Sequence, residues 1–246
     1  MGELLALLDD SKLAHDTLVL FTSEQGAQFP GCKWTNWDNG LHTSLVARWP
    51  DKIPAGKRTK AILKYSDVLP TLLDLAGQAS PPETFDGSSF AKVLLGEKDH
   101  RTRSFGMHNN YPEGPSYPIR AVTNGEWRYI HNLAPDSLYL EKPLMGRNEH
   151  NPYWQTWVFS SFSNQHHEFL INRFMKRPAE ELYHTSEDPF EMTNLAADPP
   201  HTKIKNHLAK VLDQQRQEQS APGRPLDTKQ AHQAAAKLTP LFPTKP

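Results

Sequence analysis

Three polar residues in the first part of the chain have the types and the spacing to bind a divalent cation and an oxyanion together. Glu24 and Gln25 follow an apolar run at 17–23, TLVLFTS, and Lys33 comes nine residues after Glu24. A carboxylate beside a carboxamide offers hard oxygen donors, which suit calcium or magnesium better than zinc or copper. Gly26 allows a sharp turn after them. Lys33, in a loop, offers a compact positive charge for a tetrahedral oxyanion.

The apolar run at 17–23 determines where these residues stand. Its continuous apolar, β-branched and aromatic character predicts a strand buried on both faces, as in a parallel sheet covered by helices. Ligands of such sheets bind beyond the carboxyl ends of the strands, which is where Glu24 and Gln25 lie. Each residue alone also fits a solvated strand end or loop, so the case for a site depends on the rest of the chain.

The rest of the chain divides in two by its pattern. A second strand is predicted over 43–50. Helices are predicted over 2–14, 66–77, 87–96 and 201–219. After Arg103 the pattern changes to short strands joined by turns, and Asn124-Gly125 is a strong hairpin signal. The predicted domains are therefore 1–103, 104–219 and an extended tail at 220–246.

Two loop residues of the second part are candidates for contacting a substrate. His108 and Asn109 stand in FGMHNNYPEG. A histidine there can bind a sugar or transfer a proton near neutral pH, although a loop histidine bound to backbone is the commoner case. The cluster His166-His167-Glu168 lacks the H-E-x-x-H spacing of a metal site, and adjacent histidines on a helix point apart, so this cluster is predicted to be surface.

The composition excludes several classes of function. The 246 residues include 27 basic and 28 acidic side chains, so the chain lacks the basic footprint of a nucleic-acid-binding protein. Its single cysteine, Cys32, rules out an intrachain disulfide and a cysteine-based zinc site. No apolar run of about 18 residues is present, so no membrane-spanning helix is predicted.

The motifs, taken in order, resemble those of the sulfatase family of the alkaline-phosphatase superfamily. The stretches that carry the resemblance are FTSEQG, GCKWTNWDNGLHTSLVARWP, YSDVLPTLLDLAG, DGSSFAKVLLG, IRAVTNGEWRYIHNL and ELYHTSEDPFEMTNLAADP. It runs from about residue 3 to about residue 215. The resemblance implies an α/β fold: part of a mostly parallel sheet with flanking helices, plus a small C-terminal antiparallel sheet packed with a helix.

The resemblance also implies roles for the residues introduced above. Glu24 and Gln25 correspond to calcium ligands, with magnesium as the alternative metal. The family usually has Asp at the first position and Asn or His at the second, so each replacement keeps the donor type and adds one methylene. Lys33 corresponds to a residue that contacts the sulfate group. The expected substrate is a sulfated small molecule or glycan, and His108 and Asn109 are expected to help bind it.

The nucleophile of the family is expected to be absent from this chain. Sulfatases attack with a formylglycine formed from the first residue of a Cys/Ser-x-Pro/Ala-x-Arg motif. Cys32 is followed by KWTN and does not begin one. The chain is therefore expected to be the C-terminal half of a sulfatase, with the N-terminal half as its partner, and to be inactive alone. By resemblance, the expected compartment is the periplasm or the outside of the cell.

Two other functions remain open on the sequence. A phosphodiesterase or phosphonate hydrolase of the same superfamily would use a similar half-site for a phosphoryl group. A non-catalytic glycan-binding protein would use aromatic side chains that stack on sugar rings. The tryptophans available for this are Trp34, Trp37, Trp154 and Trp157.

Overall fold

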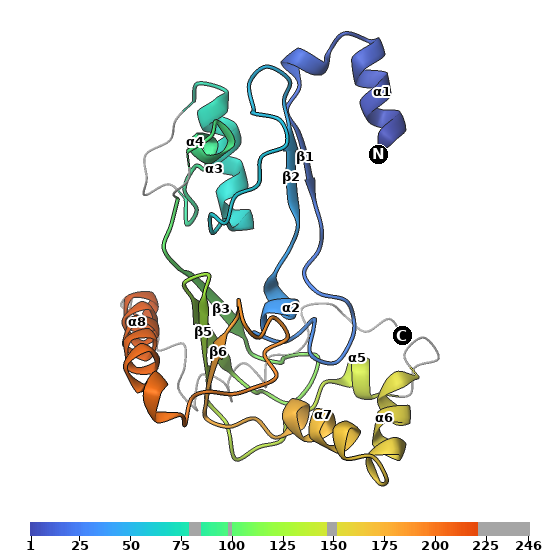
Figure 1. Ribbon diagram of the computed structural model, residues 1–246, viewed down its shortest axis with the longest axis vertical. Coiled ribbons are helices and arrows are strands. Elements are labelled where there is room, and N and C mark those ends of the chain that lie inside the picture. The colour runs from blue at the N-terminus through green and yellow to red at the C-terminus, as the bar shows by residue number, and fades with distance from the viewer. Residues whose placement is uncertain (79–84, 98–99, 147–151, 221–246) are drawn as a thin grey trace, which may run out of the picture. The chain divides into compact units, whose positions relative to one another are not determined.

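The computed structural model describes residues 1–78, 85–97, 100–146 and 152–220, and it divides into two compact units (Figure 1). The first unit comprises Met1–Glu24 and Thr43–Ser104, and the second comprises Gln25–His42 and the chain from Phe105 onward. The division near Ser104 coincides with the change in sequence pattern, whereas residues 25–42 pack within the second unit. The domain boundaries given above stay a prediction, and the tail beyond Ser220 lies outside the described residues.

The first unit is built on an antiparallel pair of strands. β1 (Val19–Thr22) pairs with β2 (Leu45–Arg48), with Phe21 opposite Val46. The helices described in this unit are α1 (Gly2–Asp10), α3 (Val68–Leu75) and α4 (Ala91–Leu94), with short 3₁₀ turns η1 (Ala14–Asp16) and η2 (Tyr65–Asp67). The predicted helices over 66–77 and 87–96 are therefore present, although each is shorter than predicted.

The first strand is covered on one face only, which corrects the expectation that it is buried on both. Leu45 and Ala47 of β2 pack against the cluster around Phe90. The cross-strand pair Phe21 and Val46 is instead 48% and 59% exposed. Alternate residues of a strand point to opposite faces, so one face of this pair is core and the other is open within the described residues. Neither strand pairs with a parallel strand in that part of the chain.

The second unit contains, among its described residues, a sheet with the strand order β3-β4-β5-β6. The strands are β3 (Ser104–His108), β4 (Ile119–Thr123), β5 (Trp127–Asn132) and β6 (Glu180–His184). β5 is antiparallel to both β4 and β6. The predicted hairpin is confirmed, because Asn124 N donates to Trp127 O at 3.1 Å. Gly125 there has a φ of 90°, which glycine adopts without a steric penalty.

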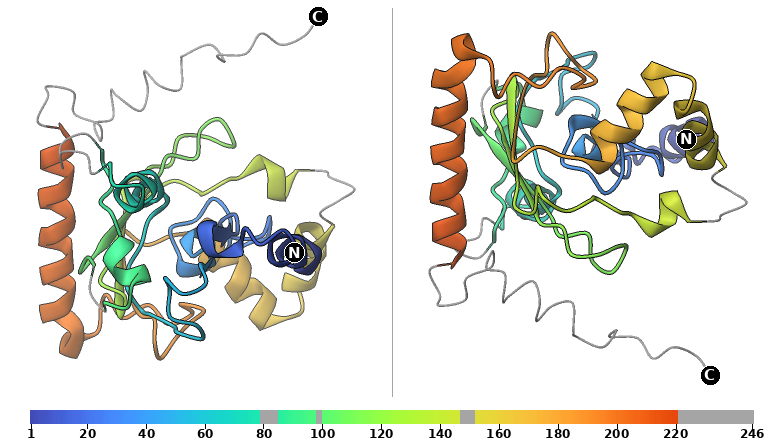
Figure 2. Two further views of the ribbon diagram at one scale, coloured as in Figure 1. Left: turned by 90° about the horizontal axis from the view of Figure 1, so that it is seen from above. Right: turned by 90° about the horizontal axis from the view of Figure 1, so that it is seen from below.

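Helices and loops cover both faces of this sheet (Figure 2). On one face, α8 (Thr202–Ser220) packs Leu208 and Leu212 against Val122, Tyr129 and Leu182. The other face carries α2 (Asp38–Leu41), α5 (Lys142–Met145), α6 (Tyr153–Ser161) and α7 (Gln165–Met175). The core on that face consists of Trp37, Tyr117, Ile119, Ala121, Ile130, Tyr139, Leu144, Trp154, Phe174 and Tyr183. The expected small antiparallel sheet packed with a helix is thus confirmed.

Candidate functional site

The two predicted metal ligands stand directly after the first strand. β1 ends at Thr22. Glu24 is exposed and is the last residue of the first segment of the first unit, Met1–Glu24. Gln25 is half-buried and begins the second unit. The predicted position of both residues just beyond a strand end is therefore confirmed, whereas their role as ligands stays a prediction.

A tight turn at Gly26 brings the chain after Gln25 against the backbone of Lys33. Gly26 has a φ of 38°. A Cβ at this position would lie 2.6 Å from Asn39 O and 2.8 Å from Lys33 N, closer than a real Cβ approaches such atoms. Both the backbone conformation and the space therefore require glycine here. The predicted sharp turn is present, and the immediate neighbour of its backbone is the Lys33 loop.

The backbone around Lys33 is fixed on both sides. Lys33 N donates to Ala27 O at 3.1 Å. Trp34, the next residue, has a φ of 66°, in the left-handed region. Its carbonyl accepts a hydrogen bond of 2.6 Å from the Tyr139 hydroxyl. The Lys33 ammonium lies 5.9 Å from the centroid of the Trp34 ring, so an aromatic face borders the positive charge.

The structure brings His108 to the same tyrosine. His108 ends β3, and its Nε2 lies 3.4 Å from the Tyr139 hydroxyl. Because that hydroxyl donates to Trp34 O, it is able to accept from a protonated Nε2. Burial lowers the pKa of His108, and the nearby charge of Arg177 lowers it further. The imidazole is therefore neutral at pH 7, the form that can accept a proton.

Asn109 is placed differently from its neighbour. Its side chain is exposed, and its carbonyl accepts from Tyr117 N at 3.0 Å. The following residue, Asn110, is fully buried and uses its Nδ2 to donate to Leu140 O at 2.7 Å and to Pro115 O at 3.0 Å. Asn110 therefore fixes the loop. The part of Asn109 that could contact a ligand is its exposed side chain.

Two buried groups of the second unit carry no signal in the sequence that would mark them as site residues, and one of them, Tyr139, contacts His108. Tyr139 and Glu141 are both 0% exposed. Glu141 Oε2 accepts from Leu144 N at 2.8 Å and so caps α5. Burial raises the pKa of Glu141 to about 7, and the charge of Glu113 contributes in the same direction. A sequence signal for the cap exists in Pro143, because proline is favoured in the first turn of a helix.

The donor chemistry of the predicted metal ligands fits calcium in part. Glu24 and Gln25 provide a carboxylate and a carboxamide, and calcium takes about six to eight oxygen ligands. In the part of the chain that the structure describes, no group of three or more His, Cys, Asp or Glu side chains could hold a metal ion. The two residues could thus provide some of the ligands of a calcium site but not all of them.

The serine form of the nucleophile motif is present in the chain. The spacing Ser-x-Pro-x-Arg does occur, at 116–120 and at 220–224. In the first instance, Tyr117 and Ile119 are core residues, 1% and 0% exposed. Arg120 donates to Ile119 O at 2.7 Å and to His108 O at 3.3 Å. The first match is therefore a structural segment that runs into β4, and the second lies almost entirely outside the described residues.

Cys32 is half-buried, and burial raises the pKa of its thiol, which keeps it protonated.

The tryptophans divide into core and partly accessible residues. Trp37 and Trp154 are 2% and 5% exposed and belong to the core of the second unit. They are not available to stack on a sugar, so two of the four tryptophans proposed for a glycan-binding function are excluded. Trp34 and Trp157 are half-buried.

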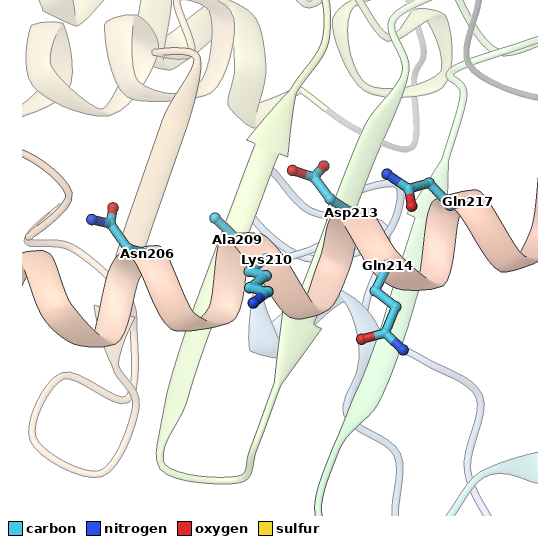
Figure 3. A pocket seen from close by; sticks show the side chains of 6 residues that line it. All are labelled: Asn206, Ala209, Lys210, Asp213, Gln214 and Gln217. Carbon is cyan, nitrogen blue, oxygen red and sulfur yellow. The ribbon is translucent and has the colours of Figure 1, made fainter.

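Other surface features are separate from these residues. A hollow on α8 is lined by side chains of that helix alone (Figure 3): Asn206, Ala209, Lys210, Asp213, Gln214 and Gln217. None of the predicted site residues contributes to it. In the cluster at 166–168, His166 and Glu168 are exposed, as predicted. None of the described helices is long and apolar enough to cross a membrane.

Comparisons with known proteins identify the family. The family model named Sulfatase matches residues 1–78. Over 219 residues the chain is 31% identical to an ulvan-active sulfatase of Formosa agariphila, and the match covers 86% of this chain and 39% of that protein. The chain is a sulfatase relative. This sulfatase-like chain resembles the C-terminal part of such proteins and spans only about two fifths of the length of the curated relatives it matches.

Solved structures share the fold of the sulfatase-like chain. A 2-O GAG sulfatase superimposes with a TM-score of 0.64 at 22% identity, and the match covers 94% of this chain and 43% of that one. The phosphonate monoester hydrolase of Agrobacterium radiobacter superimposes with a TM-score of 0.58 at 20% identity, covering 88% of this chain and 38% of that one. At these identities the likeness shows the fold alone. It confirms the α/β, alkaline-phosphatase-like fold class.

Proposed function

We propose that this chain contributes part of the active site of an enzyme that hydrolyses sulfate esters of carbohydrates. In this proposal Lys33 contacts the sulfate group, and His108 lies beside the sugar or exchanges a proton with the reacting group. Asn109 adds a hydrogen bond to the substrate. Glu24 and Gln25 are two of the calcium ligands. The kinship with sulfatases supports the reaction class.

The observation that supports the proposal most is the position of the Tyr139 hydroxyl. It lies 2.6 Å from the carbonyl oxygen of Trp34, the residue after Lys33, and 3.4 Å from His108 Nε2. Lys33 and His108 are far apart in the sequence, and one buried group connects the two segments. A cation and a neutral imidazole in one neighbourhood are suited to bind an anionic group and to exchange a proton with it.

Calcium would be held by the Glu24 carboxylate and the Gln25 carboxamide, with further ligands in addition to these two. When bound, calcium supplies positive charge that stabilises the sulfate oxygens during the reaction. Lys33 acts in the same direction, because its ammonium adds a point charge for those oxygens. His108 is neutral at pH 7 and therefore does not repel the cation.

Sulfate binding to the chain tests the proposal. Inorganic sulfate and a 6-sulfated glucosamine are titrated by calorimetry at concentrations that reach the millimolar range. Lys33→Ala is expected to weaken the binding of both ligands at least about tenfold, because a hydrogen bond to a charged group contributes about 1.5 to 3 kcal/mol and about 1.4 kcal/mol is a factor of ten. His108→Ala is expected to weaken the sulfated sugar more than inorganic sulfate.

Matched controls separate this from a general effect of charge. Lys203 is exposed on α8, and Lys203→Ala should leave both affinities unchanged. His166→Ala is the control for His108, because His166 is exposed on α7. An unchanged affinity in Lys33→Ala would contradict the proposal.

A phosphonate hydrolase is the second candidate function. The fold shared with a phosphonate monoester hydrolase makes it relevant. Methylphosphonate is titrated beside sulfate at the same pH. Tighter binding of methylphosphonate than of sulfate, lost in Lys33→Ala, would favour this function over sulfate-ester hydrolysis.

We propose further that residues 1–246 alone do not turn over an aryl sulfate. Cys32 has no motif for formylglycine formation, and the serine motif at 116–120 is part of the core around β4. Calcium-dependent turnover of an aryl sulfate by the pure chain would contradict this, and Ser116→Ala would then show whether that motif is responsible. The whole protein is proposed to work in the periplasm or outside the cell.

A further inference from the structure

Two buried carboxylates of the C-terminal stretch 181–191 hold the segment that follows Lys33. Glu181 Oε2 accepts a hydrogen bond of 2.8 Å from Trp37 Nε1. Glu191 Oε2 accepts one of 2.6 Å from Asp38 N. Both glutamates are only 1% exposed. The stretch that marks the family in the sequence is therefore in direct contact with the loop that carries the proposed sulfate lysine.

The Tyr139 hydroxyl provides a third point, through its 2.6 Å bond to Trp34 O. We name Tyr139, Glu181 and Glu191 the loop clamp. Its three bonds reach the first, the fourth and the fifth residue after Lys33. The chain between Trp34 and Asp38 is thus held at its first residue and at its last two.

Two arginines reinforce the clamp. Arg128 Nε lies 2.8 Å from Glu191 Oε1, and Arg128 NH1 donates to Asn36 O at 3.3 Å. The Arg173 guanidinium stacks 3.8 Å from the centroid of the Trp37 ring. The segment is therefore held through its backbone, an indole N–H and an aromatic face together.

The clamp is more than ordinary core packing. A buried carboxylate is unfavourable unless it is hydrogen-bonded, and an apolar side chain would fill the same space without that penalty. Glu181 meets the requirement through Trp37 Nε1, the Tyr183 hydroxyl at 2.6 Å and Asn132 Nδ2 at 2.6 Å. Hydrogen bonds are directional, whereas apolar packing is not, so polar groups at these places fix the position of the loop and not only its burial.

We infer that Tyr139, Glu181 and Glu191 are positioning residues that set the place of Lys33 for binding the sulfate group. They contact the loop and not the substrate. The inference rests on the proposed function for the role of Lys33, while the hold on the loop itself stands on the contacts above.

The test uses the full chain labelled with 5-fluorotryptophan. The chain has six tryptophans, and Trp34 and Trp37 lie in the clamped segment. Tyr139→Phe removes one hydroxyl and keeps the ring, so it is the variant least able to disturb folding. Glu181→Gln is the second variant, and its matched control is Glu187→Gln in the same stretch, whose side chain is 81% exposed.

The control for Tyr139→Phe is Tyr129→Phe. Tyr129 is 3% exposed and donates to Glu180 Oε1 at 2.7 Å, on the face of the sheet that carries α8. It therefore loses a comparable buried hydrogen bond without touching the loop. The ¹⁹F signals are recorded without ligand and then during titration with inorganic sulfate.

In the clamp variants we expect the Trp34 and Trp37 signals to shift or broaden while the signals of Trp49, in the first unit, and Trp127 stay in place. Sulfate affinity should fall about tenfold, as in Lys33→Ala. Adding Lys33→Ala to Tyr139→Phe should produce no further loss, because both changes remove the same interaction. The two control variants should bind sulfate as the unaltered chain does.

Other outcomes overturn the inference at separate points. Unchanged Trp34 and Trp37 signals in Tyr139→Phe would show that the clamp does not hold the loop. Changed signals with unchanged sulfate affinity would show that the loop position does not matter for Lys33. If the unaltered chain shows no binding that depends on Lys33, the proposed function fails, and the role of the clamp for sulfate fails with it, although the ligand-free signals still report whether the loop is held.

Discussion

Replacing Glu141 by glutamine should change how the stability of the chain depends on pH. The Glu141 side chain is 0% exposed, and its Oε1 has no hydrogen-bond partner among the described residues. Burial raises its pKa from 4.5 to about 7. Glutamine keeps the oxygen that caps α5 through Leu144 N and carries no proton to lose.

The sign and the size of the effect follow from the two pKa values. Between pH 4.5 and about 7 the unfolded chain has lost the proton of Glu141 while the folded chain still holds it. Stability therefore falls as the pH rises through this range, and the full loss is present above it. One pKa unit corresponds to about 1.4 kcal/mol, so the loss is about 3 kcal/mol. Glu141→Gln should be more stable than the unaltered chain at pH 8 by about 2 to 3 kcal/mol, with little difference at pH 4.5.

Urea unfolding at several pH values between 4.5 and 8 measures this. The summed tryptophan fluorescence is a suitable probe, because Trp37 and Trp154 belong to the same core cluster as Leu144. Glu187→Gln, at an exposed position, is the control for loss of a carboxylate. If the unaltered chain and Glu141→Gln lose stability with rising pH by the same amount, burial does not raise the pKa of Glu141 and the reasoning is wrong.

Three further results are expected. Arg101→Ala should destabilise the first unit by about 1.5 to 3 kcal/mol in urea unfolding, because it removes a charged hydrogen-bond partner of the fully buried Asp67 carboxylate, which keeps its backbone donors Lys64 N and Ser88 N; a loss below about 0.5 kcal/mol would contradict this. Gly87→Ala should prevent that unit from folding, as seen by loss of cooperative melting, because the new Cβ would lie 2.0 Å from Ser66 O; a normal melt would refute the close approach. His108 should titrate below 6.5 when followed by NMR, because burial and Arg177 both disfavour its charged form, and a value above 6.5 would exclude the buried ring.

The features that the sequence predicts well depend on local patterns. The Asn124-Gly125 turn and the apolar stripe of 201–219 each specify an element within a few residues, and the structure contains both. The position of Glu24 and Gln25 after a strand is equally local, since the apolar run at 17–23 ends there. In each case the residues that decide the structure lie inside the segment itself.

The features that the sequence misses depend on distant partners. The helices α6 and α7 were not predicted, because α6 distributes aromatic and polar residues around its axis, with Trp154 buried and Phe159 75% exposed. The open face of β1 was missed because an apolar run does not tell which face is covered. Tyr139 and Glu141 carry no local sign of burial, and only the folded second unit shows that both are buried and that Tyr139 adjoins His108.

The loop clamp also sets the order in which the chain can acquire its final form. Trp37 and Glu181 are 144 residues apart, and Asp38 and Glu191 are 153 apart. During synthesis at about 5 to 20 residues per second, the loop is made roughly 7 to 30 s before these two glutamates exist. Contacts over such long sequence separations form late, since the intervening chain must be brought together first. A nascent chain that stops between Tyr139 and Glu181 therefore carries its lysine on a loop that lacks both glutamates of the clamp.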